Sequence, residues 1–149
     1  MAKINARDWL FEVSPDPDAG TPVWNAIAGL TSFTLSNSEG EESVETTDFD
    51  SAGIHESQAM QRGASLSLEG NVVRNGAVAD PGQAAADALA LLVGEASLGG
   101  VRFRHTSDTD WTVWTAWVSK GDNAGGNNDK TSWSASFTRS GAATTDPVV

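Results

Sequence analysis

Residues 130–139, which read K-T-S-W-S-A-S-F-T-R, alternate between apolar and small hydroxyl-bearing side chains. One set of alternate positions is mostly apolar and consists of Thr131, Trp133, Ala135 and Phe137. The other set is polar and consists of Lys130, Ser132, Ser134, Ser136 and Thr138. Successive side chains of a β-strand point to opposite faces, so the pattern predicts a strand with one apolar face and one row of hydroxyls. A helix would place Trp133 and Phe137 on the side of Ser134, which argues against that alternative.

The same alternation occurs in residues 63–72 and 30–36. The positions expected to face inward are Ala64, Leu66, Leu68 and Val72, and Phe33 and Leu35. The outward positions carry short polar side chains: Ser65, Ser67, Glu69 and Asn71, and Ser32, Thr34 and Ser36. Solvent-facing sheets usually include Lys, Arg and long polar residues. We therefore expect a smooth, hydroxyl-rich surface with almost no positive charge, although an ordinary solvated face rich in Ser and Thr fits the same pattern.

Four other stretches have the character of strands: residues 7–13, 23–28, 100–105 and 110–119. The last is apolar on both faces, with Trp111, Val113 and Trp117 on one and Trp114, Ala116 and Val118 on the other. Strands that are covered on both sides have this composition. We expect the domain itself to cover one face, and a partner is a candidate cover for the other.

One helix is predicted, over residues 81–93. Asp80 is placed to cap its N-terminus, Pro81 takes the first helical position, and Gln83 follows the cap by three residues. Gly94 is a candidate for the C-terminal cap. The apolar residues on one side of this helix, which would cover the apolar face of the sheet, are Ala85, Leu89, Leu92 and Val93.

Residues 37–61 form a long segment with little periodicity and many carboxylates. It contains no Lys or Arg, and its acidic residues are Glu39, Glu41, Glu42, Glu45, Asp48, Asp50 and Glu56. A loop of this length inside a domain is usually functional or disordered. An acidic arm that becomes ordered on meeting a neighbour fits the pattern, and so does a solvated, flexible loop. Residues 140–149 are predicted to be a mobile tail.

Composition limits the class of protein. The chain has 149 residues, six Trp, no Cys and a net charge of −11, which favours a single β-rich domain without disulfides or thiolate metal sites. The N-terminal residues do not resemble a signal peptide and no stretch approaches a membrane span, so we expect a protein that stays in the cytoplasm or is assembled there. The acidic balance argues against nucleic-acid binding, because contacts with phosphate need Lys and Arg.

Candidate chemistry is sparse. His55 and His105 lie in different segments without the spacing of metal ligands. Residues 48–53, D-F-D-S-A-G, are similar to the start of a calcium loop but lack its third carboxylate and its closing Glu. The Asp and Asn residues between 122 and 129 could bind calcium, although such residues also fill turns. No nucleophile motif or phosphate-binding loop is present, and we therefore predict no enzyme activity, no cofactor and no metal site.

Four pieces of the sequence together resemble the major tail tube proteins of long, flexible-tailed bacteriophages. They are G-L-T-S-F-T-L-S (29–36), T-T-D-F-D-S-A-G (46–53), M-Q-R-G-A-S-L-S-L-E-G (60–70) and N-N-D-K-T-S-W-S-A-S-F-T-R-S-G (127–141). The resemblance covers nearly the whole chain and implies a mainly β, sandwich- or barrel-like subunit with one short helix (81–93) and a long loop (37–61). It also implies hexameric rings, stacked into a tube that conducts DNA from a virion.

The resemblance gives the surface patterns candidate roles. The residues expected to line the channel, where DNA passes without specific binding, are Ser32, Thr34, Ser36, Ser65, Ser67, Glu69, Ser132, Ser134 and Ser136. The residues expected to bridge subunits are Glu41, Glu42, Glu45, Asp48, Phe49 and Asp50. Strand edges of neighbouring subunits would then join into a closed barrel. The implied partners are further copies of the chain, a tape measure protein, and tail terminator and tail tip proteins, with no membrane involved.

Two rival functions belong to other classes. A carbohydrate-binding β-sandwich would expose Trp side chains on one face and hold calcium in loops rich in Asp and Asn. A metal-dependent enzyme is a more distant alternative. The exposure of the Trp side chains distinguishes the first rival from a tube subunit.

Overall fold

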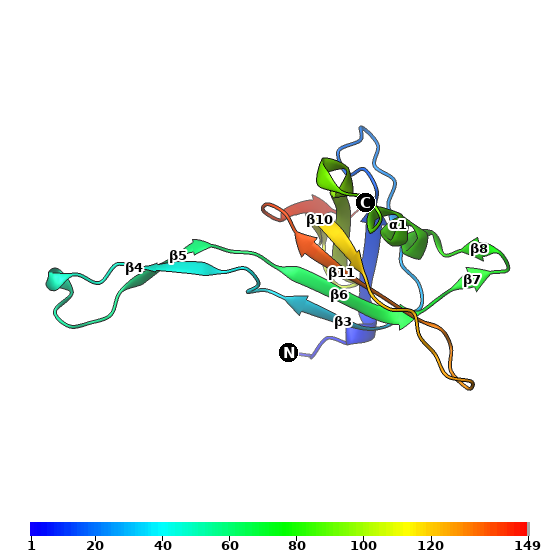
Figure 1. The fold of residues 1–149 in the computed structure, drawn as a ribbon, viewed down its shortest axis with the longest axis horizontal. Helices are drawn as coiled ribbons and strands as arrows, with labels where there is room; N and C mark the ends of the chain where they lie inside the picture. Colours follow the sequence, from blue (N-terminus) through cyan, green and yellow to red (C-terminus); the bar gives the residue numbers. More distant parts are fainter. Residues whose placement is uncertain (149) are drawn as a thin grey trace.

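The computed structural model describes residues 1–148 and is mainly β, with antiparallel strands and one α-helix (Figure 1). The strands of the main sheet are β1 (Trp9–Ser14), β2 (Asn25–Ala26), β3 (Leu30–Ser36), β6 (Ser65–Asn71), β9 (Gly99–His105), β10 (Asp110–Lys120), β11 (Ser132–Arg139) and β12 (Thr144–Pro147). Two short hairpins project from it, β4 (Glu42–Glu45) with β5 (Ser57–Gln61), and β7 (Arg74–Asn75) with β8 (Val78–Ala79). The helix α1 spans Pro81–Leu89, and one-turn 3₁₀ helices occur at Ala6–Asp8, Phe49–Ser51 and Gly94–Ser97.

The main sheet curls until β3, the strand at one end, approaches β1, the second strand from the other end. Its strand order is β2-β1-β9-β10-β11-β6-β3, so β1 and β3 are far apart in the order of pairing. The ring of Phe33 on β3 nevertheless lies 5.2 Å from that of Phe11 and 5.6 Å from that of Trp9, both on β1. Aromatic packing at these separations contributes beyond simple burial. The predicted sandwich- or barrel-like subunit is therefore confirmed, with one open seam between β1 and β3.

The core lies between the concave face of the sheet and α1. The fully buried side chains include Leu66 and Leu68 of β6 and Trp133 and Phe137 of β11, all at positions that the alternation places inward. The indole Nε1 of Trp133 donates a hydrogen bond to Asp87 Oδ1 of α1 at 3.0 Å. The helix thus covers the apolar side of the strands, and the hydroxyl-rich side faces away from it.

The start of α1 is fixed as its sequence predicts. Asp80 accepts a hydrogen bond from the backbone N–H of Gln83, and Pro81 is the first helical residue. The buried side chain of Gln83 bonds three backbone groups: Nε2 donates to the carbonyls of Ala28 (3.0 Å) and Asn71 (2.8 Å), and Oε1 accepts from the N–H of Val73 (3.1 Å). One side chain therefore joins the helix to the ends of two strands.

The end of the helix differs from the prediction. The helix stops at Leu89 rather than at residue 93, and Ala90 caps it. Leu92 and Val93, which the pattern placed on the inward side, are 47% and 86% exposed. Leu89 is the last residue of α1 and is buried, whereas Leu91 is 85% exposed, so the core contact of this segment ends with Leu89. Gly94, with a φ of +68°, begins the following 3₁₀ turn instead.

The C-terminal segment also differs from the prediction. Residues 140–149 are predicted as a mobile tail, but β12 pairs antiparallel with residues 110–113 of β10. β10 is longer than β11, which pairs only with residues 116–120, and β12 occupies the remaining edge. The N–H of Val148 also bonds to the carbonyl of Thr109 at 2.9 Å. Residue 149 lies outside the described part of the chain.

The long acidic segment forms an arm. Residues 37–61, predicted as a loop, contain the β4–β5 hairpin, which extends far from the sheet (left side of Figure 1). β5 leads almost directly into β6, so the arm continues one of the strands of the main sheet. We use "the arm" for residues 37–61 from here on.

Candidate functional site

The predicted hydroxyl-rich positions of three strands lie side by side. β11 pairs with β6, and β6 pairs with β3, in a register that produces cross-strand rows. From one end of the sheet to the other, the rows are Ser36–Ser65–Thr138, Thr34–Ser67–Ser136, Ser32–Glu69–Ser134 and Asn71–Ser132. We call this surface the polar face. The structure therefore brings together all nine residues for which a channel-lining role is predicted.

The polar face carries negative charge and no cation at these positions. Glu69 is its charged member, and Ser32 Oγ donates to Glu69 Oε2 at 3.3 Å. Ser65 is buried rather than exposed, because its hydroxyl hydrogen-bonds the carboxylate of Glu39 from the base of the arm. Two nearby cations are engaged on the side of α1 and the core: Lys120 lies 3.5 Å from Asp87, and Arg139 stacks over Trp114 at 5.7 Å. Lys130 lies at the end of the face, where it lines a hollow with Asn71 and Ser132. A phosphate backbone facing this surface would meet hydroxyls and carboxylates.

The face has members beyond the nine predicted channel residues. Thr138 and Asn71, which the alternation already places on the polar side, complete two of the rows, and Ser119 of β10, which sequence reasoning missed, lies opposite Ser136. Trp117, which pairs with Thr138, is 44% exposed on the same side. The period-two pattern of residues 110–119 contains the signal for Ser119 and Trp117, because both share a face of β10.

Trp117 is the one exposed tryptophan among the six. Trp111, Trp114 and Trp133 are buried, and Trp9 and Trp24 are half-buried. Arg102 lies over the rings of both Trp24 and Trp111, at 4.6 and 4.3 Å, so the chain itself covers much of the second apolar face of β10. A row of exposed Trp, which a carbohydrate-binding surface would need, is not formed by residues 1–148.

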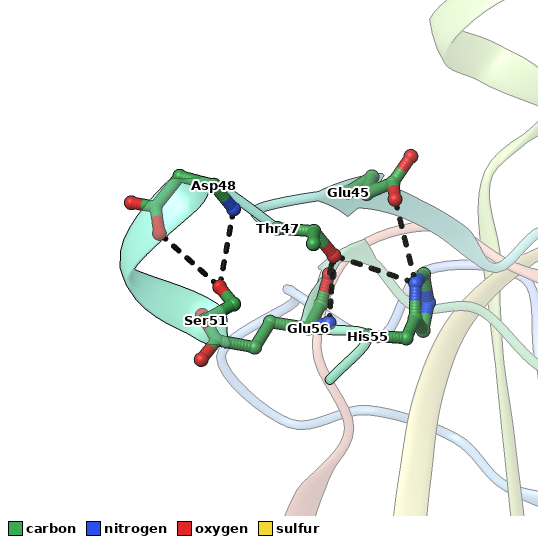
Figure 2. A network of polar contacts seen from close by, with 6 residues as sticks. All are labelled: Glu45, Thr47, Asp48, Ser51, His55 and Glu56. Atoms are coloured by element: carbon green, nitrogen blue, oxygen red, sulfur yellow. Dashed lines mark hydrogen bonds and ion pairs between the residues drawn. The ribbon is translucent and has the colours of Figure 1, made fainter. Parts of the chain in front are cut away.

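The tip of the arm is held by its own hydrogen bonds (Figure 2). Asp48 Oδ1 accepts from the N–H of Asp50 at 3.0 Å, and Ser51 Oγ accepts from the N–H of Asp48 at 3.1 Å, which forms a capping box. Across the hairpin, Thr47 Oγ1 accepts from the N–H of Glu56 at 2.8 Å. These contacts order the tip without a partner.

The same network presents apolar side chains to solvent. Phe49, between Asp48 and Asp50, has a relative exposure of 106%. Ile54, Met60 and Val44 on the arm are 68%, 65% and 44% exposed. Exposed apolar groups that cluster on an ordered projection are typical of a surface that contacts another molecule.

All six arm residues predicted to bridge subunits lie on this projection, and some form ion pairs within the arm or at its base. Glu41 pairs with Arg62 at 3.1 Å, and Glu45 lies 3.4 Å from His55 Nδ1. Phe49 and Asp50 extend from the 3₁₀ turn at the tip. The arm therefore has an acidic tip around one exposed aromatic ring.

The residues considered for calcium instead support turns. Asp48 caps the 3₁₀ turn, Asp129 Oδ2 accepts from the N–H of Gly126 at 3.0 Å, and Asn123 donates to the carbonyl of Ser132 at 2.7 Å. Within residues 1–148, no three His, Cys, Asp or Glu side chains are grouped as metal ligands. Within the same range, no helix is both long and apolar enough to cross a bilayer.

The fold was compared with known protein families, curated proteins and solved structures. No protein-family model matches the sequence, and no curated protein matches it as a relative. Solved structures do match the fold. A chain in the tail of an empty gene transfer agent particle, refined with C6 helical symmetry, has a TM-score of 0.70 at 23% identity, over 95% of this chain and 98% of that one.

Two further structures extend this likeness. A chain of the virion of a native gene transfer agent particle has a TM-score of 0.71 at 21% identity, over 97% of this chain and 99% of that one. A chain in the six-fold symmetrised baseplate of the anti-feeding prophage has a TM-score of 0.60 at 15% identity, over 99% and 97%. This protein therefore shares its fold with components of such tails and baseplates.

Proposed function

We propose that the protein is the structural subunit of a viral tail tube, which polymerises as stacked hexameric rings and conducts DNA during injection. The observation that carries this proposal is the polar face, a cation-free array of hydroxyls and carboxylates on the side of the sheet opposite α1. The shared fold supports it, because one matching chain belongs to a particle tail with C6 symmetry.

The open strand edges support closure by neighbouring subunits. On one side of the polar face, β3 pairs with β6 and, within residues 1–148, with no strand on its other edge. On the far side, β9 pairs with β10 only as far as Ala116, which leaves residues 117–120 without a strand partner on that edge. Unpaired edges favour pairing with another chain. We expect β3 of one subunit to meet this part of β10 in the next.

The dimensions of such a ring suit a duplex. Four strands from each of six subunits, spaced ~4.8 Å and tilted ~40°, would close at a diameter of roughly 48 Å. Side chains of ~5 Å on each wall would leave a channel of roughly 38 Å, wider than B-form DNA. Short hydroxyl side chains keep the channel wide, and a surface without Lys or Arg gives phosphates no salt-dependent anchor.

The arm would join subunits to one another. Its exposed Phe49, Ile54 and Met60 have no cover within the described chain. The two ends of the tube would contact tail terminator and tail tip proteins. Before DNA passes, the channel would hold a tape measure protein. The place of action would be the virion tail, after assembly in the host cytoplasm.

Electron microscopy of the purified protein tests the proposal. Negative-stain images at increasing protein concentration should show six-fold rings or tubes with a stain-filled channel. Sedimentation under the same conditions should show large species. A protein that stays monomeric and featureless at the highest concentration would contradict a self-assembling tube subunit.

A further inference from the structure

A hollow of about 600 Å³ is lined by residues of α1 and the β7–β8 hairpin, elements that lie at the end of the molecule opposite the arm (right side of Figure 1). Its lining comes from α1, the β7–β8 hairpin, and the loop that joins β10 to β11. Buried Trp133 and Gln83 line it together with three cationic residues, Arg74, Lys120 and Lys130. We call it the basic hollow.

The basic hollow concentrates positive charge in an acidic protein. The chain has nine Lys and Arg against 20 Asp and Glu, and three of the nine line this one hollow. Its single carboxylate, Asp87, pairs with Lys120 at 3.5 Å. Arg74 and Lys130 are exposed and form no ion pair within residues 1–148. Two cations therefore remain available to an acidic partner.

The arm tip has the complementary chemistry. Asp48 and Asp50 flank the exposed Phe49 in the chain, and Glu56 follows across the hairpin. Hydrogen bonds of Asp48, Ser51 and Thr47 hold the backbone of this tip in advance (Figure 2). A preorganised tip loses less conformational freedom on binding than a flexible loop. The arm and the elements that line the basic hollow lie at opposite ends of the molecule (Figure 1), so the tip of one copy can reach the hollow of another copy.

We propose that the arm tip of one subunit docks in the basic hollow of a second copy, with its carboxylates facing Arg74 and Lys130. The inference rests on the proposed function and names the surface that receives the arm. The two contacting surfaces differ, so the interface is head-to-tail and can repeat without limit along a stack. A second hollow, between β1 and β3, contains one cation, Arg7, and is the weaker electrostatic match.

Charge reversal tests the docking. R74E/K130E should raise the protein concentration needed for assembly at least ~10-fold, and more at low salt, where charge interactions are least screened. Adding D50K/E56K to the same chain should restore much of the loss. The matched control is K3E/R7E, which changes the net charge equally outside the basic hollow. Normal assembly of R74E/K130E, or a loss confined to K3E/R7E, would overturn the proposal.

Cross-linking gives a second readout that does not depend on tube morphology. The chain has no Cys, so F49C/T131C introduces one thiol at the arm tip and one at the rim of the basic hollow. A short bismaleimide should produce a ladder of covalent oligomers, whereas each single-Cys variant should give at most dimers. Tubes without a ladder would overturn the docking and keep the proposed function. A ladder without rings or tubes would support the docking and contradict the tube.

Discussion

The indole nitrogen of Trp133 donates to Oδ1 of Asp87 at 3.0 Å and ties the central strand β11 to α1. Trp133 is 2% exposed, and its neighbours on β11 alternate between core and polar face. The residue that holds the helix in place is therefore adjacent to Ser132 and Ser134, which belong to the proposed channel. The stability of the domain and the shape of the proposed channel would therefore depend on the same strand.

Replacing Trp133 should destabilise the protein strongly. Trp133→Ala removes a large buried ring and a hydrogen bond, and should lower the free energy of unfolding by roughly 3–5 kcal/mol. Trp133→Phe keeps an aromatic ring and should cost about 1–2 kcal/mol. Urea denaturation measures both. Trp117→Phe is the matched control at an exposed position and should change stability by less than about 1 kcal/mol.

Replacing Gln83 should also lower the free energy of unfolding, because its side chain satisfies three backbone groups. Gln83→Ala would leave the carbonyls of Ala28 and Asn71 and the N–H of Val73 without their side-chain partner. Unsatisfied buried polar groups cost about 1–3 kcal/mol each, so we expect a loss of at least ~2 kcal/mol in urea denaturation. Gln61→Ala removes one exposed hydrogen bond, to the carbonyl of Gly40, and should be nearly neutral. Equal effects of the two substitutions would contradict this account of Gln83.

Deleting residues 40–56 should separate folding from assembly. The removed residues contain none of the six Trp, and the core lies elsewhere, so Trp fluorescence and the urea midpoint should stay close to those of the intact chain. The variant should remain monomeric in sedimentation at concentrations where the intact chain assembles. Phe49→Ala, which leaves the arm in place, should weaken assembly less than the deletion. Normal tubes from the deletion variant would refute a bridging role for the arm.

Positive charge on the polar face should make DNA adhere. In S134K/S136K tubes, each new cation that reaches a phosphate should add a salt-dependent contact, and binding of duplex DNA should fall as salt rises, with a slope of about −0.9 per contact. The control S140K/T145K adds the same charge at exposed positions outside the polar face. Filter binding with sheared duplex DNA at several salt concentrations measures both. Identical DNA binding by the two variants would contradict a channel role for Ser134 and Ser136.

The faces of the strands could be predicted from sequence because burial imposes a period of two. Trp133, Ala135, Phe137, Leu66 and Leu68 are all buried at the predicted positions. The register that aligns the hydroxyls into rows follows from this alternation, since a slip by one residue would turn every apolar side chain outward. The nine predicted residues of the polar face therefore come together, although their role in a channel remains a prediction.

What could not be predicted depends on tertiary context. β12 forms along the part of the β10 edge that β11 leaves free, and the helix ends at Leu89, the last of its side chains that is buried in the core. The arm is ordered by short-range hydrogen bonds such as those of Thr47 and Asp48. Because these bonds leave no periodic pattern of hydrophobic residues in the sequence, the hairpin could not be predicted. The basic hollow joins Arg74, Lys120 and Lys130 from separate segments, and only the topology brings them together.

The arm and the channel strand are joined with little slack. Only residues 62–64 separate β5 from β6, and a Cβ on Gly63 would collide with the carbonyl oxygen of Glu39 on the opposite side of the arm base. In the proposed tube, a connection this tightly packed would pass strain from the arm to β6. Bending of the tail, which pulls one ring against the next, would then also change the diameter of the proposed channel.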